Sequence, residues 1–308
     1  MQEFEYEKRI MGSEAAISLI AANREIADAA FLRMCSVAET LESTFSRFLP
    51  DSELSRINTG GTHSASPLFL DILSMGLQLS ERSNKIFNPL VDISRFGYDE
   101  DIRKVKGTSR TKHTDTEYSV DSSALSIDAE SQTVSLSVGQ RLDFGGFLKG
   151  HAAECMAREA TECGGVILNL GGDIYTQGSS EEGTSFVFSI TNPITDGEDA
   201  LFQVQDMAVA TSGTYNRFWA LEEKKMHHIL DSSGTRNPDS DIVSATVIAP
   251  RGYEADGFAT VAVSLGSGKA PQFLNTLGFQ FYLITNTGDV VMSKHFPLMK
   301  SVAVSSYE

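Results

Sequence analysis

The chain has 308 residues, of which 41% are hydrophobic, and a net charge of −16, so it can bury a sizeable core but lacks the clustered Lys and Arg that nucleic-acid phosphates require. Its three cysteines form no CxxC pair, and no window approaches the roughly 20 apolar residues that span a bilayer, which argues against a disulfide framework, a zinc site and a transmembrane segment. No basic start precedes an uncharged apolar run, so we expect a cytoplasmic protein as the sequence stands, or an exported or periplasmic one if a signal segment was removed.

The N-terminal part of the chain shows a strand pattern followed by two helix patterns. The run AAISLIAA, which begins at Ala15 and ends at Ala22, is typical of a strand. From Asn23, a favoured cap residue, apolar side chains recur at helical spacing, which predicts an amphipathic helix ending near Pro50. A second helix is predicted from Pro67, a favoured first-turn residue, through the run LFLDILSMGLQLSERS.

The middle of the chain is more varied. Residues 104–123 are polar and without periodicity, which indicates a surface insertion. Residues 124–140 alternate apolar and polar side chains around a turn, as a hairpin does. A helix is predicted over residues 149–162, followed by a strand over residues 165–170.

The C-terminal half alternates strands and helices. Strand-like runs are FVFSIT, AVATSG, SATVIAP and FYLIT, helices are expected from about Asp256 and over residues 269–277, and NTG at residues 286–288 predicts a hairpin turn. The chain shows no internal repeat and no obvious linker. We therefore expect one α+β domain over residues 1–308, a mixed sheet core with flanking helices that leaves room for two lobes.

One stretch, LDFGGFLKGHAAE at residues 142–154, suggests an anion site. Gly145 and Gly146 let the backbone approach a ligand closely, and a helix start offers N–H groups and a positive dipole end to a phosphate. Lys149 could pair with a phosphate or with Asp143, although a surface lysine is the default for a single case.

The stretch EADGFAT at residues 254–260 places Asp256 and Thr260 four residues apart, on one face of a helix. Carboxylate and hydroxyl oxygens are hard ligands suited to magnesium. The alternative is an N-capping Asp and a buried Thr bonded back to its own helix. Taken alone, the sequence favours that alternative.

Three further stretches allow two interpretations each. His227 and His228 are neighbours, so on a strand they point to opposite faces; one could act as a general base, or each could simply be a hydrogen-bonded structural residue. The strand ending Thr211, Ser212 and Gly213 could meet a ligand or form a capped turn. The run NLGGD at residues 169–173 could let the backbone pack closely near a site or could close a tight turn, and the sequence favours the turn.

The order of these stretches resembles the ApbE-type flavin transferases, the FAD-dependent protein FMN transferases, from MGS at residues 11–13 nearly to the C-terminus. The blocks that carry the resemblance are FSRFLPDSELSRIN, NKIFNPLV, LDFGGFLKGHAAE, LNLGGD, VATSGTYNRF, HHILDSSG and EADGFATVAVSLG. No single block is diagnostic. Their number and common order make the resemblance specific.

The resemblance implies an enzyme that binds FAD and magnesium, cleaves the pyrophosphate and attaches FMN through a phosphoester to a threonine of an acceptor flavoprotein, releasing AMP. It implies metal ligation by Asp256, Thr260 and the carbonyl of Gly146, and His228 as the base that deprotonates the acceptor hydroxyl. The positions that it assigns to FAD are Met11, Phe48, Ile86, Phe87, Asn88, Asp143, Lys149, Thr211, Ser212 and Gly213. The acceptor threonine is expected in a motif of the type Asp-Gly/Ala-x-Ser/Thr-x-Ala-Thr.

Two residues depart from the family pattern. Asn88 stands where the family usually has an aspartate, so an uncharged amide replaces a carboxylate, and Phe48 stands where some relatives have tyrosine. Two alternatives follow: a magnesium-dependent FAD pyrophosphatase that yields FMN and AMP with water as acceptor, and a flavin-binding protein without turnover. Asn88 is the sole support for the second alternative, and intact Asp256, Thr260 and His228 speak against it.

Overall fold

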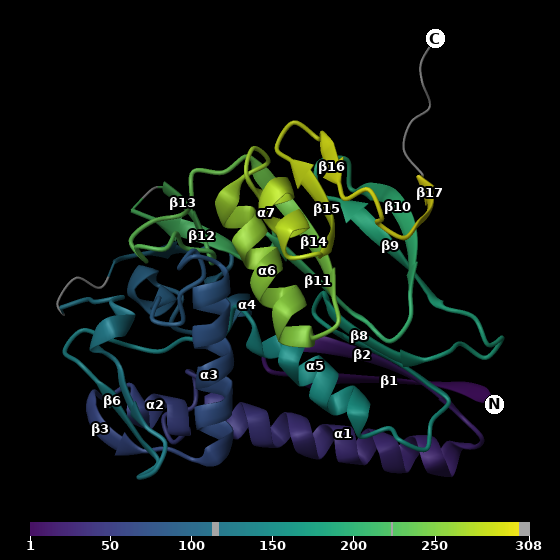
Figure 1. The fold of residues 1–308 in the computed structure, drawn as a ribbon, viewed down its shortest axis with the longest axis horizontal. Helices are drawn as coiled ribbons and strands as arrows, with labels where there is room; N and C mark the ends of the chain where they lie inside the picture. Colours follow the sequence, from purple (N-terminus) through teal and green to yellow (C-terminus); the bar gives the residue numbers. More distant parts are fainter. Residues whose placement is uncertain (113–116, 223, 302–308) are drawn as a thin grey trace. The chain divides into compact units, whose positions relative to one another are not determined.

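The computed structural model describes residues 1–112, 117–222 and 224–301, and the chain forms two compact units (Figure 1). Unit 1 comprises Met1–Ala38, Lys149–Gly213 and Ser240–Glu308, and unit 2 comprises Glu39–Leu148 and Thr214–Asp239. Each unit is therefore assembled from segments that are distant in the sequence. Within the described ranges, no helix is both long and apolar enough to cross a membrane.

Unit 1 is built on an eight-stranded sheet in which all neighbouring strands are antiparallel. In spatial order the strands are β1 (Gln2–Ile10), β2 (Ser13–Ala21), β7 (Gly165–Leu170), β8 (Asp173–Gly178), β11 (Ala208–Gly213), β14 (Ile242–Ala249), β15 (Gln280–Thr285) and β16 (Val290–Met292). Gly171 and Gly172, with φ of 66° and 101°, form the tight turn between β7 and β8, which confirms the turn predicted in NLGGD. The predicted NTG turn is confirmed between β15 and β16.

The two faces of this sheet are covered differently. On one face, α6 (Gly252–Leu265) packs against β11 and β14 and against α7 (Ala270–Thr276) (Figure 1). On the other, Val209 and Ile248 join Phe202 in an apolar cluster with a three-stranded sheet. That small sheet consists of β9 (Phe186–Asn192), β10 (Gly197–Val204) and β17 (Leu298–Ser301). These strands and helices confirm the α+β class.

Three helix boundaries differ by several residues from those predicted, and the first is the end of α1 (Arg24–Phe45), which lies before Pro50. α6 begins at Gly252 instead of near Asp256, so Asp256 lies in its second turn. α5 (Leu148–Arg158) ends before the predicted residue 162, because its last residues tighten into bonds such as Ala160 N–H to the Ala157 carbonyl at 3.1 Å.

α1 (Arg24–Phe45) runs from unit 1 into unit 2 and confirms the predicted long helix. Its start is capped as predicted, since the Asn23 side chain accepts the Ile26 N–H at 3.0 Å. The helix of unit 2 that was predicted from Pro67 is also confirmed: α3 (Pro67–Arg82) has Ser66 as its cap, and the Ser66 hydroxyl accepts the Phe69 N–H at 3.1 Å.

Apart from α3 and the end of α1, unit 2 consists of short elements. Its remaining elements are α2 (Glu53–Ile57), β3 (Gly61–Ser64), the 3₁₀ helix η1 (Ile93–Phe96), α4 (Ile102–Val105), β4 (Ser109–Arg110), the 3₁₀ helix η2 (Ser122–Ala124), β5 (Ser126–Asp128), β6 (Thr133–Leu136), β12 (Phe218–Leu221) and β13 (Lys224–His227). β5 and β6 confirm the predicted hairpin, and β3 extends it. An aromatic cluster joins the two ends and the middle of the segment Glu39–Leu148. The rings of Phe45, Phe69 and Phe144 are centred 5.6 to 5.7 Å apart.

The stretch predicted as a surface insertion begins inside the packed part of unit 2. Val105 is fully buried beside Trp219, and β4 pairs in parallel with β12. Residues 113–116 of the stretch lie outside the described residues.

Candidate active site

In unit 1, α6 presents Asp256 and Thr260 one turn apart, as the sequence spacing predicts. Asp256 is only 3% exposed, and the Thr260 hydroxyl lies 3.1 Å from the Ser212 hydroxyl at the end of β11. The interpretation of Asp256 as a helix cap is wrong, because α6 starts a full turn earlier. Asp256 is therefore a buried carboxylate that the helix holds in place.

Lys149 lies beside this carboxylate. Its ammonium pairs with the Asp173 carboxylate, and its Nζ is 3.9 Å from Asp256 Oδ2. Asp173 is 2% exposed, so two buried acids flank one lysine. The carboxylates that hold the ammonium are thus those of Asp173 and Asp256 instead of Asp143, and pairing of Lys149 with a phosphate stays a prediction. These three charges sum to −1, which favours a further cation at this place.

The start of α5 packs directly on the start of α6. The Gly150 N–H donates to Asp256 Oδ2 at 3.1 Å, and a Cβ on Gly150 would lie only 2.2 Å from the Gly252 carbonyl oxygen. Only glycine allows this backbone contact. Gly145 N–H likewise donates to Asp143 Oδ1, at 2.8 Å. One amide of the helix start, that of Gly150, is therefore already bonded to a carboxylate.

The oxygens gathered in unit 1 fit magnesium. In the described part of the chain, no group of three or more His, Cys, Asp and Glu side chains could cage a metal ion. Magnesium does not need such a cage, since it keeps several waters and commonly takes one or two protein carboxylates beside substrate phosphates. A buried Asp256 with the hydroxyls of Thr260 and Ser212 nearby supplies that kind of donor set.

The three residues at the end of β11 that were predicted to contact FAD have different surroundings. Alternation along the strand sets Ser212 on the α6 face, where it meets Thr260, and Thr211 on the opposite face, where its hydroxyl lies 2.9 Å from that of Thr246. Gly213 pairs with Ser244 on β14. Met11 occupies the turn between β1 and β2 with φ of 48°. For Met11, Thr211 and Gly213, contact with FAD stays a prediction.

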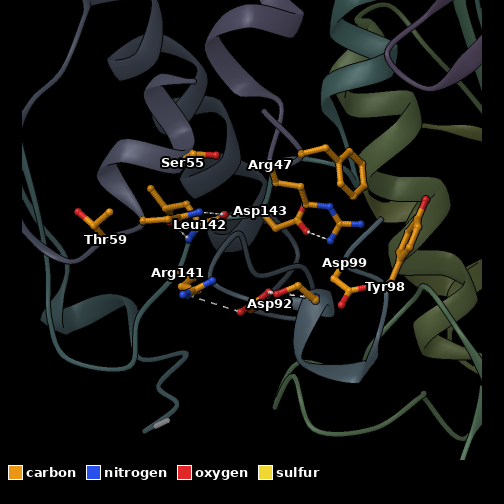
Figure 2. Close-up of a pocket in the computed structure, with 12 residues that line it drawn as sticks. Arg47, Ser55, Thr59, Asp92, Tyr98, Asp99, Arg141, Leu142 and Asp143 are labelled. Atoms are coloured by element: carbon orange, nitrogen blue, oxygen red, sulfur yellow. Dashed lines mark hydrogen bonds and ion pairs between the residues drawn. The ribbon is translucent and has the colours of Figure 1, made fainter. Parts of the chain in front are cut away.

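In unit 2, a cavity of about 320 Å³ contains two of the predicted FAD positions, Phe48 and Asp143 (Figure 2). Phe48 is 44% exposed, and its ring centre is 6.2 Å from that of Tyr98. The guanidinium of Arg47 lies 4.7 Å from the Phe48 ring centre and 4.4 Å from the Tyr98 ring centre. The cavity thus offers aromatic surface beside a guanidinium whose charge is paired with the Asp143 carboxylate at 3.0 Å.

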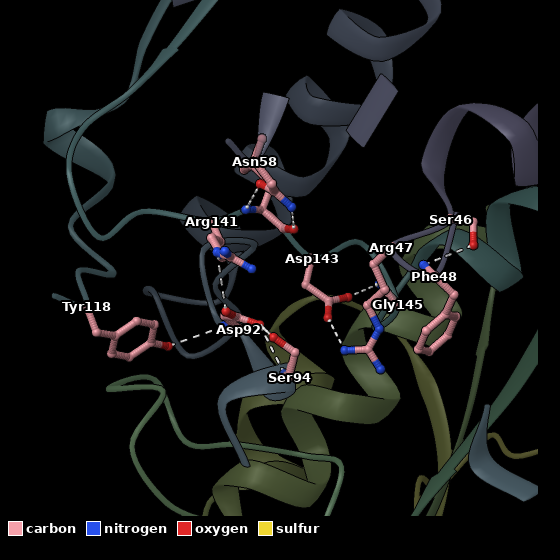
Figure 3. A network of polar contacts seen from close by, with 11 residues as sticks. Ser46, Arg47, Phe48, Asn58, Asp92, Ser94, Tyr118, Arg141, Asp143 and Gly145 are labelled. Carbon is pink, nitrogen blue, oxygen red and sulfur yellow. Dashed lines mark hydrogen bonds and ion pairs between the residues drawn. The ribbon is translucent and has the colours of Figure 1, made fainter. Parts of the chain in front are cut away.

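Two sequence blocks meet at the wall of this cavity (Figure 3). The Asn58 side chain clamps the backbone of Leu142, accepting its N–H at 2.7 Å and donating to its carbonyl at 2.9 Å. The next residue, Asp143, accepts from Arg47 at 3.0 Å. The clamp therefore fixes the Asp143 carboxylate against Arg47 and joins residues 45–58 to residues 142 and 143 within unit 2.

Asn88, the residue that departs from the family pattern, has a structural task in unit 2. Its amide donates to the Val120 carbonyl at 2.9 Å, and its Oδ1 accepts the Leu90 N–H at 3.0 Å. An aspartate could not donate to Val120. The asparagine is thus explained by the fold of this chain, which weakens the sole support for a flavin-binding protein without turnover.

The neighbours of Asn88 and Gly146 form close packing. Phe87 is 6% exposed, and its ring meets the ring of Phe147 edge-on at 5.8 Å. A Cβ on Gly146 would lie 2.9 Å from the Phe87 ring. Ile86 is half-buried. Gly146 belongs to unit 2 and Asp256 to unit 1, so the role of the Gly146 carbonyl as a metal ligand stays a prediction.

The neighbouring histidines His227 and His228 of unit 2 have different surroundings. His227 ends β13, and its Nδ1 accepts the Ile229 N–H at 3.3 Å, while Asn237 bonds both polar groups of its backbone. Burial, reinforced by the Lys225 charge, lowers the pKa of His227 to about 4, so this imidazole is neutral at pH 7. His228 is half-buried, and its N–H donates to the Arg217 carbonyl at 3.2 Å. His227 is thus a structural residue, which leaves His228 as the candidate base.

The sequence analysis did not single out four residues that make long-range polar contacts in the structure: Arg47, Asn58, Asp173, and Glu154, which accepts the Gly252 N–H at the start of α6. Each acts through a partner at least 24 positions away along the chain. All four lie inside the blocks that carry the family resemblance, and that was the available signal.

Comparisons with known proteins agree with this arrangement. The model of the ApbE family matches residues 11–283. The chain is 28% identical over 284 residues to the FAD:protein FMN transferase of Escherichia coli (strain K12), a match that covers 86% of this chain and 79% of that protein. It is 24% identical over 282 residues to the FAD:protein FMN transferase of Haemophilus influenzae, covering 87% and 81%.

Solved structures show the same fold. The apo form of the flavinyl transferase ApbE from Pseudomonas stutzeri superimposes with a TM-score of 0.78 at 19% identity, over 95% of each chain. The ApbE protein of Thermotoga maritima superimposes with a TM-score of 0.82 at 19% identity, over 96% of this chain and 98% of that one. Because the family model matches most of the sequence, the chain belongs to the ApbE family.

Proposed function

We propose that this chain is a magnesium-dependent FAD:protein FMN transferase, which moves FMN from FAD to a threonine of an acceptor flavoprotein and releases AMP. The observation that carries the proposal is the buried Asp256 carboxylate and the half-buried Thr260 hydroxyl on α6, beside Lys149 in a chain of the ApbE family. The curated relatives named above have this activity in their names.

The reaction balances as a phosphoryl transfer. The threonine hydroxyl oxygen bonds to the phosphorus of the FMN half of FAD, the bond from that phosphorus to the oxygen shared with AMP breaks, and AMP leaves with the electron pair. The hydroxyl proton passes to a base, for which His228 is the candidate. Such transfers depend mostly on positioning and on neutralising oxygen charge.

The residues divide these tasks. Asp256 and Thr260 would hold magnesium, with the Gly146 carbonyl as a further predicted ligand; when bound, the ion would neutralise charge on the pyrophosphate. Lys149 brings a fixed positive charge to an otherwise acidic place, and Asp173 holds that lysine. Phe48 and Asp143 line the cavity of unit 2, where the flat part of FAD would find aromatic surface.

The test replaces one ligand. Asp256→Asn keeps the side-chain volume and removes the charge, so we expect magnesium-dependent release of AMP from FAD to fall by about 100-fold. Glu254→Gln, two residues earlier on α6, is the matched control, because residues two apart on a helix do not share a face. Wild-type activity in the Asp256 variant would refute the metal assignment.

A further inference from the structure

Glu154 is a buried carboxylate for which the proposed function has no task. It lies on α5, is 1% exposed, and accepts three hydrogen bonds. The Gly252 N–H donates to Oε2 at 2.7 Å, and Oε1 receives Arg251 Nε at 2.8 Å and an Arg158 guanidinium nitrogen at 2.5 Å. A buried carboxylate is costly unless donors compensate it, and these donors do.

These contacts lie where α6 begins. Arg251 is the cap residue of α6, and its side chain makes no capping hydrogen bond to the helix. Glu154 supplies the missing acceptor for the first-turn N–H of Gly252 from 98 positions away. Its negative charge also stands at the positive end of the helix dipole.

The two helices are joined at two points. Gly150 and Glu154 are four residues apart on α5, and Gly252 and Asp256 are four apart on α6, so each pair shares one face of its helix. Glu154 accepts from Gly252, and Gly150 donates to Asp256 at 3.1 Å. Between these bonds the backbones touch, since a Cβ on Gly252 would lie 1.9 Å from the Gly150 carbonyl oxygen.

We propose that Glu154 is a positioning residue for the metal ligands. By fixing the first turn of α6 against α5, it sets the place of Asp256 in the second turn and of Thr260 in the third. It is itself proposed as a ligand of neither FAD nor metal, because its carboxylate oxygens accept from Gly252, Arg251 and Arg158. The inference rests on the proposed function in so far as Asp256 and Thr260 bind magnesium, and it adds a residue that controls how well they do so.

Two readouts test this role. The first is amide hydrogen exchange over residues 252–260 in the metal-free protein, and the second is the magnesium concentration that gives half-maximal AMP release at saturating FAD. For Glu154→Ala we expect the amide exchange rates over residues 252–260 and the half-maximal magnesium concentration each to rise about tenfold. That factor is the usual cost of losing a residue that orients a metal ligand. Glu154→Gln keeps an acceptor for Gly252 and should show the same changes at roughly a third of that size.

Arg158→Ala is the matched control, since it removes one partner of Glu154 and leaves the bond to Gly252, and we expect neither readout to change. A folded Glu154→Ala protein with unchanged exchange over residues 252–260, or with an unchanged magnesium requirement, would overturn the proposal. If that variant does not fold, the same two results in Glu154→Gln decide. Should the wild type need no magnesium, the proposed function fails, and the exchange data alone decide on Glu154.

Discussion

The contact between α5 and α6 leaves no room for a side chain, which makes Gly150→Ala an informative change. The new Cβ would lie 2.2 Å from the Gly252 carbonyl oxygen and 2.8 Å from Asp256 Cβ, whereas ordinary contact begins at 3.4 Å. Because the nearest obstacle is backbone, the helices must separate by about 1 Å. The Gly150 N–H bond to Asp256, now 3.1 Å, would then be lost.

Stability and activity should respond differently to this substitution. Overpacking costs about 1–3 kcal/mol, and alanine returns about 1 kcal/mol in helix propensity, so the free energy of unfolding should fall by no more than about 2 kcal/mol. A displacement of about 1 Å at a metal ligand can reduce turnover by about 100-fold. We therefore expect a folded protein with a small loss of stability and a large loss of magnesium-dependent AMP release.

The assays are thermal unfolding and AMP release from FAD at several magnesium concentrations. Gly268→Ala is the control, because a Cβ there meets nothing within 4 Å and its φ is not in the left-handed region. We expect that control to behave as wild type. The reasoning is refuted if Gly150→Ala keeps both wild-type stability and wild-type turnover.

Two further substitutions test unit 2. The pKa of His227 is lowered from 6.5 to about 4, so the unfolded chain binds more protons between these values, and stability is complete above about pH 6.5 and lost as the pH falls. Between about pH 7.5 and pH 5, His227 should account for a loss of about 2 kcal/mol in the free energy of unfolding. His227→Asn keeps an acceptor for the Ile229 N–H and should remove that part of the pH dependence, measured by urea titration at each pH. An unaltered pH dependence in this variant would contradict the assignment. Asn88→Asp restores the usual family residue but leaves the Val120 carbonyl without its donor, so it should lower the free energy of unfolding by about 1–3 kcal/mol, whereas a gain in stability would show that the amide has no structural task.

Local signals in the sequence predicted much of the fold. Asn23 marks a helix start through a side chain that bonds three residues on, Pro67 marks one through its own fixed φ in the first turn, and the glycine pair of NLGGD specifies a turn of two residues. The spacing of Asp256 and Thr260 likewise defines one helix face. Each of these features depends on neighbours along the chain.

The features that sequence reasoning missed depend on distant partners. The start of α6 was placed four residues late because its acceptor is Glu154, on another helix, and no local cap marks Gly252. Asp173 was assigned only to a turn because its partner, Lys149, lies on α5, 24 positions earlier in the sequence. Family resemblance supplied the metal and FAD assignments, since an acid and a hydroxyl four residues apart do not by themselves specify a ligand.

The central claim, transfer of FMN to a protein threonine, is tested most directly by intact-protein mass spectrometry. A flavoprotein domain carrying the motif Asp-Gly/Ala-x-Ser/Thr-x-Ala-Thr is incubated with this protein, FAD and magnesium, beside a copy whose final threonine is replaced by alanine. We predict a mass increase of one FMN on the threonine form alone, with one AMP released per FMN attached. Release of FMN and AMP with no increase in acceptor mass would contradict the claim and identify a hydrolase.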